Sequence, residues 1–148
     1  MRKTLMAALW MLACTAWTAH AQNSVEAQKN LEKRIIGEWC NPYTWQDTGE
    51  LKGFRFEPGG KCSAVGIPSL ELDTWRIEDG YLLIKGHSVD ESGKREAYET
   101  RERIGQLTSD SLELVTQEAS PRLAFLYLNT KSIKKLVPRE EPDASKQR

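Results

Sequence analysis

This sequence has no excess of basic residues over acidic ones. Its 148 residues include 21 Lys and Arg and 21 Asp and Glu, so the formal net charge is zero. Non-specific binding to nucleic acid requires a concentration of positive charge on one face. Charged residues make up 28% of the chain and are mixed in sign, which is typical of a solvated surface. We therefore expect no nucleic-acid partner.

Long hydrophobic runs are also missing beyond the N-terminus. The apolar run at residues 5–15 is too short to cross a hydrocarbon core of about 30 Å. It follows Arg2 and Lys3 and precedes the small-residue site Ala19-His20-Ala21, which is the pattern of a secretory signal peptide. We predict a signal peptide at residues 1–21 and a periplasmic or secreted mature protein without a transmembrane segment. Acylation at Cys14, within a degraded lipoprotein box, is the minor alternative.

Cysteine and histidine are scarce in the expected mature chain, which retains Cys40, Cys62 and His87. One histidine cannot supply a two-histidine metal site, and we expect no metal and no cofactor. The two cysteines could form one disulfide, which an oxidising compartment permits, or could remain separate thiols. Their separation in sequence does not decide between these alternatives, because a disulfide depends on the distance between the Cα atoms.

No catalytic constellation stands out. Ser88 and Asp90 lie near His87, but residues one and three apart on a strand point to the opposite face, so these side chains do not form a triad. Glu71 and Asp73 share a strand face as a carboxylate pair, a pattern that is common on exposed strands without function. We leave enzymatic activity uncertain and expect none, with a hydrolase as the least supported alternative.

Short apolar or alternating runs, separated by turn residues about every ten positions, indicate an all-β domain. We predict a short helical lead-in over residues 22–34, a β domain over 35–130 and a polar, disordered tail over 131–148. Residues 42–49 are predicted to form a loop. The expected strands are 37–41, 50–57, 61–66, 70–77, 81–89, 95–104, 111–117 and 122–129.

The links between consecutive strands are short. They require antiparallel neighbours, since a parallel crossover needs about a dozen residues or more. A sheet of eight such strands exposes its edges unless it closes on itself. We therefore predict an eight-stranded antiparallel up-and-down barrel preceded by a short N-terminal helix, with a two-sheet sandwich as the alternative.

Several short motifs follow one another along the chain. They are Gly37-Glu38-Trp39, Gly53-Phe54, Gly60-Lys61 with Ser63, Trp75, and Leu107 to Leu112. Their order resembles that of the lipocalins and the wider calycin group, and most closely that of the short secreted lipocalin-like domains of bacteria. The resemblance covers about residues 35 to 128 and implies a small barrel with a ligand cavity. The Thr-Asp-Tyr motif of many animal lipocalins is missing.

The resemblance also implies structural roles. In lipocalins the tryptophan of the Gly-x-Trp signature closes one end of the barrel and stacks beneath an arginine from the final strand. Carried to this sequence, the signature residues are Gly37 and Trp39, and the arginine is Arg122. Such a cation–π contact contributes about 0.5–2 kcal/mol.

An eight-stranded barrel is either filled by side chains or wide enough for one small ligand. Alternation places a set of aromatic and apolar residues on the expected inner face, although ordinary core packing gives the same pattern. The residues that we predict to bind a ligand are Phe54, Phe56, Trp75, Ile77, Tyr98, Phe125 and Tyr127. On the sixth strand, Tyr98, Thr100 and Glu102 share one face. Either this face makes part of the barrel interior polar, or the strand is exposed to solvent and forms cross-strand ion pairs.

Two functions remain open at this point. The first is an extracytoplasmic binding protein that holds a small hydrophobic or amphiphilic molecule, such as a lipid, in the barrel. The alternative is a packed barrel that binds another extracytoplasmic protein through its loops, with Tyr43 and Trp45 exposed on the loop at 41–49.

Overall fold

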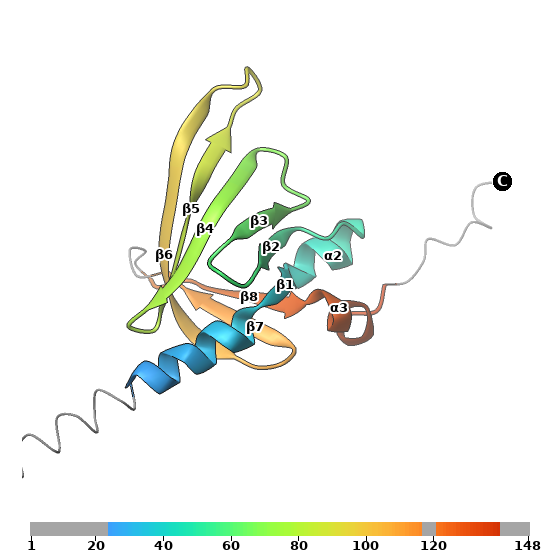
Figure 1. Ribbon diagram of the computed structural model, residues 1–148. Coiled ribbons are helices and arrows are strands. Elements are labelled where there is room, and N and C mark those ends of the chain that lie inside the picture. Colours follow the sequence, from blue (N-terminus) through green and yellow to red (C-terminus); the bar gives the residue numbers. More distant parts are fainter. Residues whose placement is uncertain (1–23, 117–120, 140–148) are drawn as a thin grey trace, which may run out of the picture.

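The computed structural model describes residues 24–116 and 121–139 of the chain (Figure 1), so the predicted signal peptide and Cys14 lie outside the described residues. All eight predicted strands are present, with ends that differ by three residues or fewer where both ends are described. They are β1 (Gly37–Cys40), β2 (Gly53–Phe56), β3 (Cys62–Val65), β4 (Leu70–Glu78), β5 (Tyr81–Val89), β6 (Arg95–Leu107), β7 (Ser111–Val115) and β8 (Ala124–Asn129).

The strands form one antiparallel sheet in the order β3-β2-β1-β8-β7-β6-β5-β4. Because β1 pairs with β8, the sheet curls round until β3 and β4 face each other, and we call this junction the seam. Lys61 and Thr74 form an isolated bridge across it. Trp75 also spans the seam: its backbone N–H donates to the Gly60 carbonyl and its indole N–H to the Glu57 carbonyl, both at 2.9 Å. The nearly closed barrel is confirmed, and the sandwich is excluded.

The helix at residues 24–35 precedes β1, close to the predicted lead-in. A second helix, α2 (Pro42–Thr48), replaces the predicted loop. The Asn41 side chain caps it by accepting from the N–H groups of Tyr43 and Thr44 at 2.9 and 3.1 Å. Gly49 ends it with a φ of 75°, a left-handed conformation that favours glycine. The loop prediction is therefore wrong, because both ends of this segment carry helix-capping residues.

A third helix, α3 (Thr130–Leu136), lies where we predicted the start of a disordered tail. The Asn129 side chain caps it by accepting from the N–H of Lys131 at 3.0 Å. Ile133 is completely buried and packs with Cys40 and Leu128 in a small cluster separate from the main core. The tail prediction is wrong for this part of the chain, because a single apolar residue in a polar segment anchors the helix. Residues 140–148 lie outside the described residues.

The main core fills one end of the barrel. Its largest members, among them Trp39, Phe56, Leu82 and Leu114, are 1% exposed or less. Ile35, from the last turn of the N-terminal helix, is fully buried with them. Each buried side chain of this size contributes about 1.5–3 kcal/mol relative to an exposed one. This end of the barrel is therefore packed by side chains.

Trp39 does not stack on Arg122. The Trp39 indole N–H donates to the Ile35 carbonyl at 2.7 Å, and the β1–β8 register places Trp39 opposite Asn129. Arg122 precedes β8 and is exposed, seven residues before Asn129. At about 3.3 Å per residue, these positions are roughly 20 Å apart. The role that the resemblance implied for Arg122 is therefore wrong. Gly37 has a φ of 140°, which favours glycine at that position.

Cys40 and Cys62 are buried free thiols, so the disulfide alternative is excluded. Cys62 belongs to the core inside the barrel, whereas Cys40 packs in the separate cluster beneath α3. Trp39 points inward, and the next residue on the strand points to the other side of the sheet. The sheet thus separates the two thiols. Burial raises the pKa of Cys40 and raises that of Cys62 to about 11, so both remain protonated.

Candidate functional site

The three strands β4, β5 and β6 extend beyond the rest of the barrel (Figure 1). β5 pairs with β6 from Arg95 to Arg103, whereas β7 pairs only with the part of β6 from Arg103 to Leu107. Among the described residues, the first half of β6 has no strand on its second edge. The inner face of this half is therefore less covered than the packed end.

Polar residues occupy this less covered part of the inner wall. The register places Tyr98 opposite Gly86, Thr100 opposite Ile84 and Glu102 opposite Leu82. Residues paired in this way share one face of a sheet, and Leu82 and Ile84 belong to the core. Tyr98, Thr100 and Glu102 therefore face inward, yet they are only partly buried. The inner wall is polar and accessible at this end, and the outer-strand alternative is excluded.

Gly86 is required for this arrangement of strands. A Cβ atom at this position would lie 2.1 Å from the Glu71 carbonyl oxygen and 2.7 Å from the Cα atom of Leu72. The backbones of β4 and β5 approach closely here, beside a register shift between Leu72 and Thr74.

Tyr127 of β8 is electrostatically coupled to the polar residues of β6. Burial raises the pKa of Tyr127 to about 12, and the charges of Glu102 and Tyr98 add to the shift. Burial also raises the pKa of Tyr98, against the effect of a hydrogen bond with Thr100 and with a further contribution from Glu102. We call Tyr98, Thr100, Glu102 and Tyr127 the polar cluster. Both phenols are neutral at physiological pH and can donate hydrogen bonds.

Glu102 has no cationic partner among the described residues. Burial raises its pKa, and no neighbouring cation opposes the shift. A carboxylate that is partly removed from water and has no paired cation retains unused acceptor capacity. A hydrogen-bond donor or a cation on a bound molecule would give the Glu102 carboxylate the partner that it lacks.

Aromatic rings connect the polar cluster to the core. The centroids of Tyr127 and Phe54 are 5.4 Å apart, those of Phe54 and Phe56 6.1 Å, and those of Phe56 and Trp75 5.7 Å. These separations are typical of favourable aromatic pairs. The row runs from β8 through β2 to β4. Four of the seven predicted ligand-binding residues thus form one continuous row of aromatic rings, which joins Tyr127 of the polar cluster to the buried core.

The other three predicted residues lie at different depths. Ile77 is 2% exposed in the packed end, and Tyr98 belongs to the polar cluster. Phe125 lies opposite Leu114 in the register and on the same face as Tyr127, but it is 39% exposed near the start of β8. Contact of these residues with a ligand stays a prediction. Thr100 and Glu102 were recognised from the sequence only as sharing a face with Tyr98, and alternation was the available signal.

The histidine and the carboxylate pair considered for catalysis lie on the outer face of the long strands, whereas Ser88 alternates to the inner face. His87 Nδ1 is 3.4 Å from Asp73 Oδ2, and Glu71 forms an ion pair with Arg95. In the part of the chain that the structure describes, no group of three or more His, Cys, Asp or Glu side chains comes together as metal ligands would. Within the same residues, no helix is both long and apolar enough to cross a membrane.

The comparisons with known proteins agree with this architecture. A family model described as lipocalin-like matches residues 31–130. Among solved structures, a lipocalin-like protein from Bacteroides thetaiotaomicron VPI-5482 is similar, with a TM-score of 0.56 and 28% identity over 65% of this chain and 96% of that chain. No curated protein matches the chain. Because the family model covers more than half of the sequence, the chain belongs to the lipocalin-like family.

Proposed function

We propose that this protein binds one small amphiphilic molecule at the accessible end of its barrel, outside the cytoplasm. The observation that carries the proposal is the inward-facing, partly buried carboxylate of Glu102, which has no cationic partner among the described residues and lies near two neutral phenols. A purely structural barrel would gain nothing from a carboxylate at this position, because its partial desolvation costs free energy.

The surroundings of Glu102 define the chemistry of the ligand. The apolar part of the ligand would lie on the rings of Phe54 and Tyr127, whose centroids are 5.4 Å apart. The head group would donate a hydrogen bond to Glu102 and accept one from Tyr98 or Tyr127. A carboxylate head would be repelled by Glu102. The proposed ligand is therefore a neutral or cationic amphiphile with a hydroxyl, amide or amine head rather than a fatty-acid anion.

The test compares three probes with the same alkyl chain: dodecylamine, dodecanol and dodecanoate. Each displaces the fluorescent probe N-phenyl-1-naphthylamine from the purified protein. We expect the amine and the alcohol to bind more tightly than the acid. Glu102→Gln should weaken dodecylamine binding about tenfold or more, because a hydrogen bond to a charged group contributes about 1.5–3 kcal/mol.

Glu99→Gln is the matched control, since Glu99 lies on the outer face of the same strand and pairs there with Lys85 at 3.2 Å. This substitution should leave all three affinities unchanged. Equal binding of the acid and the amine by the wild-type protein would refute the proposed ligand class. An equal effect of the Glu99 and Glu102 substitutions would refute the proposed site.

The extracytoplasmic location rests on the signal-peptide pattern of residues 1–21. The intact mass of the protein purified from its own host tests it. Loss of residues 1–21 supports export as a free protein, whereas a mass that includes an acylated Cys14 at the N-terminus supports the lipoprotein alternative. Retention of the whole N-terminus in the purified protein would contradict both.

Binding of another protein through residues 41–49 has less support. Trp45, expected to be exposed on a loop, is partly buried, and its indole N–H donates to the Val137 carbonyl at 2.9 Å. Tyr43 is 66% exposed on α2. One exposed aromatic residue is a small anchor for a protein interface, since such sites are clusters of anchoring residues.

A further inference from the structure

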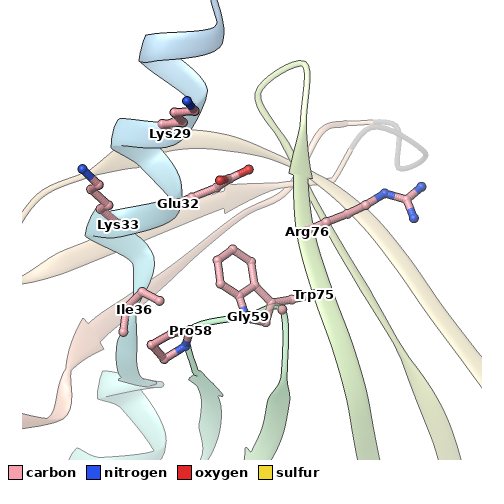
Figure 2. A pocket seen from close by; sticks show the side chains of 9 residues that line it. Lys29, Glu32, Lys33, Ile36, Pro58, Gly59, Trp75 and Arg76 are labelled. Atoms are coloured by element: carbon pink, nitrogen blue, oxygen red, sulfur yellow. The ribbon is translucent and has the colours of Figure 1, made fainter.

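We infer that a groove outside the barrel is a second binding site, which takes a small anionic amphiphile. The groove lies between the N-terminal helix and β4 and has a volume of about 630 Å³ (Figure 2). Small-molecule sites commonly measure about 300–1,000 Å³. None of the polar-cluster residues lines this groove, so it is separate from the site at the end of the barrel.

The turn between β2 and β3 explains why the groove is hollow. Pro58, Gly59 and Gly60 form one of its walls. Gly59 has a φ of 81°, and a Cβ atom placed there would meet no heavy atom within 4 Å. The turn needs glycine for its backbone conformation, and Gly59 adds no side chain to the groove that it lines.

Trp75 provides a fixed apolar floor. Its indole N–H is bound to the Glu57 carbonyl at 2.9 Å, and its ring packs edge-on against Phe56 at 5.7 Å. Figure 2 shows the Trp75 ring between the helix and the β2–β3 turn, with Ile36 and Pro58 nearby. An aromatic or aliphatic body can pack on this surface without rearrangement of the tryptophan.

Positive charge predominates around the floor. Lys29 and Lys33 are one helical turn apart on the helix, whereas the side chain of Arg76 extends from β4 away from the helix (Figure 2). Neither lysine has an ion-pair partner among the described residues, while Arg76 pairs with Glu78 at 3.1 Å. Glu32 is the one carboxylate that lines the groove, and its side chain extends from the helix toward the side of Trp75 (Figure 2). Because Arg76 is turned away and paired with Glu78, the two lysines and Glu32 leave one net positive charge at the groove. An acidic head group is the complement of this rim.

The test uses two probes that share a phenylnaphthylamine body: 1-anilinonaphthalene-8-sulfonate, which carries a sulfonate, and N-phenyl-1-naphthylamine, which does not. We expect the wild-type protein to bind the sulfonate probe more tightly. The double variant Lys29→Gln/Lys33→Gln should weaken binding of the sulfonate probe about 2- to 30-fold, the range for two solvent-exposed charge contacts, and should not change binding of the neutral probe. The difference between the probes should decrease as salt is added.

The control double variant Lys94→Gln/Lys131→Gln removes the same charge from the β5–β6 turn and from α3. It should leave both affinities unchanged. Glu102→Gln should leave binding of the sulfonate probe unchanged, because Glu102 does not line the groove. Equal weakening in the two lysine double variants would overturn the proposal, because it would reflect net charge alone. Unchanged binding of the sulfonate probe in Lys29→Gln/Lys33→Gln would also overturn it, and tighter binding in Glu102→Gln would place that probe in the barrel instead.

Discussion

Glu102 and Leu82 lie opposite each other in the register of β6 and β5 and share the inner wall of the barrel. Leu82 is 1% exposed, whereas Glu102 is only partly buried and has no cationic partner among the described residues. The boundary between the packed core and the polar cluster therefore lies between two neighbouring side chains. A ligand in this barrel would meet the apolar surface and the carboxylate at the same depth.

Glu102 makes the stability of the protein depend on pH. Its pKa is raised in the folded state, so the folded protein holds the proton more tightly than the unfolded chain. The resulting stabilisation is fully present below the unfolded pKa and is lost as pH rises through the folded pKa. We expect Glu102→Gln to match the wild type near pH 4 and to be the more stable of the two near pH 7.5, because the amide needs no ionisation.

Urea denaturation at both pH values measures this difference. Glu99→Gln is again the control, and its effect should not grow with pH in the same way. A Glu102→Gln advantage of equal size at pH 4 and pH 7.5 would contradict the assignment of the shift to this carboxyl.

Trp75 should hold the seam closed through its indole group. Trp75→Phe keeps an aromatic ring against Phe56 but removes the hydrogen bond to the Glu57 carbonyl. We expect a loss of about 1 kcal/mol in the free energy of unfolding and faster hydrogen exchange of the backbone amide at position 75, which donates to Gly60.

Trp45→Phe removes a similar bond, to Val137, away from the seam, and provides the comparison. It should leave exchange at position 75 unchanged. If the two substitutions accelerate hydrogen exchange at position 75 equally, Trp75 has no particular role at the seam.

Asn41 should stabilise α2 as its N-cap. Asn41→Ala removes the acceptor for the N–H groups of Tyr43 and Thr44 and should cost about 1 kcal/mol. Asn41→Asp retains an acceptor and should have little effect. Chemical denaturation of the three proteins measures the difference, and equal destabilisation by Ala and Asp would show that the cap is not the reason for any loss.

The two thiols should be unreactive in the folded protein. Both are buried with raised pKa values, so Ellman's reagent should titrate neither until the protein unfolds, and then it should titrate both. Ile133→Ala removes the side chain of α3 that packs with Cys40. We expect a destabilisation of about 2–4 kcal/mol and faster reaction of Cys40 than of Cys62.

Single-cysteine variants, Cys40→Ser and Cys62→Ser, identify which thiol reacts. Equal acceleration of both thiols in Ile133→Ala would mean that global unfolding, rather than local opening of α3, exposes them. One thiol or none in the unfolded wild-type protein would contradict the assignment of both cysteines as free.

The strands were predictable from sequence because turn residues and alternation are local signals. The helix α2 was not recognised, although Asn41, Pro42 and Gly49 are residues that commonly begin and end helices. Its seven residues are too few to show a helical period of apolar positions. The capping residues were the available signal, and they outweighed the loop-like composition of the segment.

How deeply each inward-facing residue is buried was not predictable from the sequence. Ile77 and Tyr98 alternate in the same way on their strands, yet Ile77 is 2% exposed and Tyr98 is only partly buried. The difference arises because β7 covers the later part of β6 and stops at Val115. Similarly, the resemblance to lipocalins identified Trp39, but the residue opposite it depends on the register with β8. Both properties come from non-local pairing, which one sequence does not specify.

The junction of β3 and β4 also affects how the wall can move. A barrel that is hydrogen-bonded all the way round keeps a circumference set by its strand number and stagger. Here the isolated Lys61–Thr74 bridge and the two hydrogen bonds of Trp75 join the first and last strands of the sheet order. Separation of β3 from β4 at the seam would increase the circumference of the barrel and leave the seven strand-to-strand ladders intact. Ligands of different width could then enter the barrel without unfolding it.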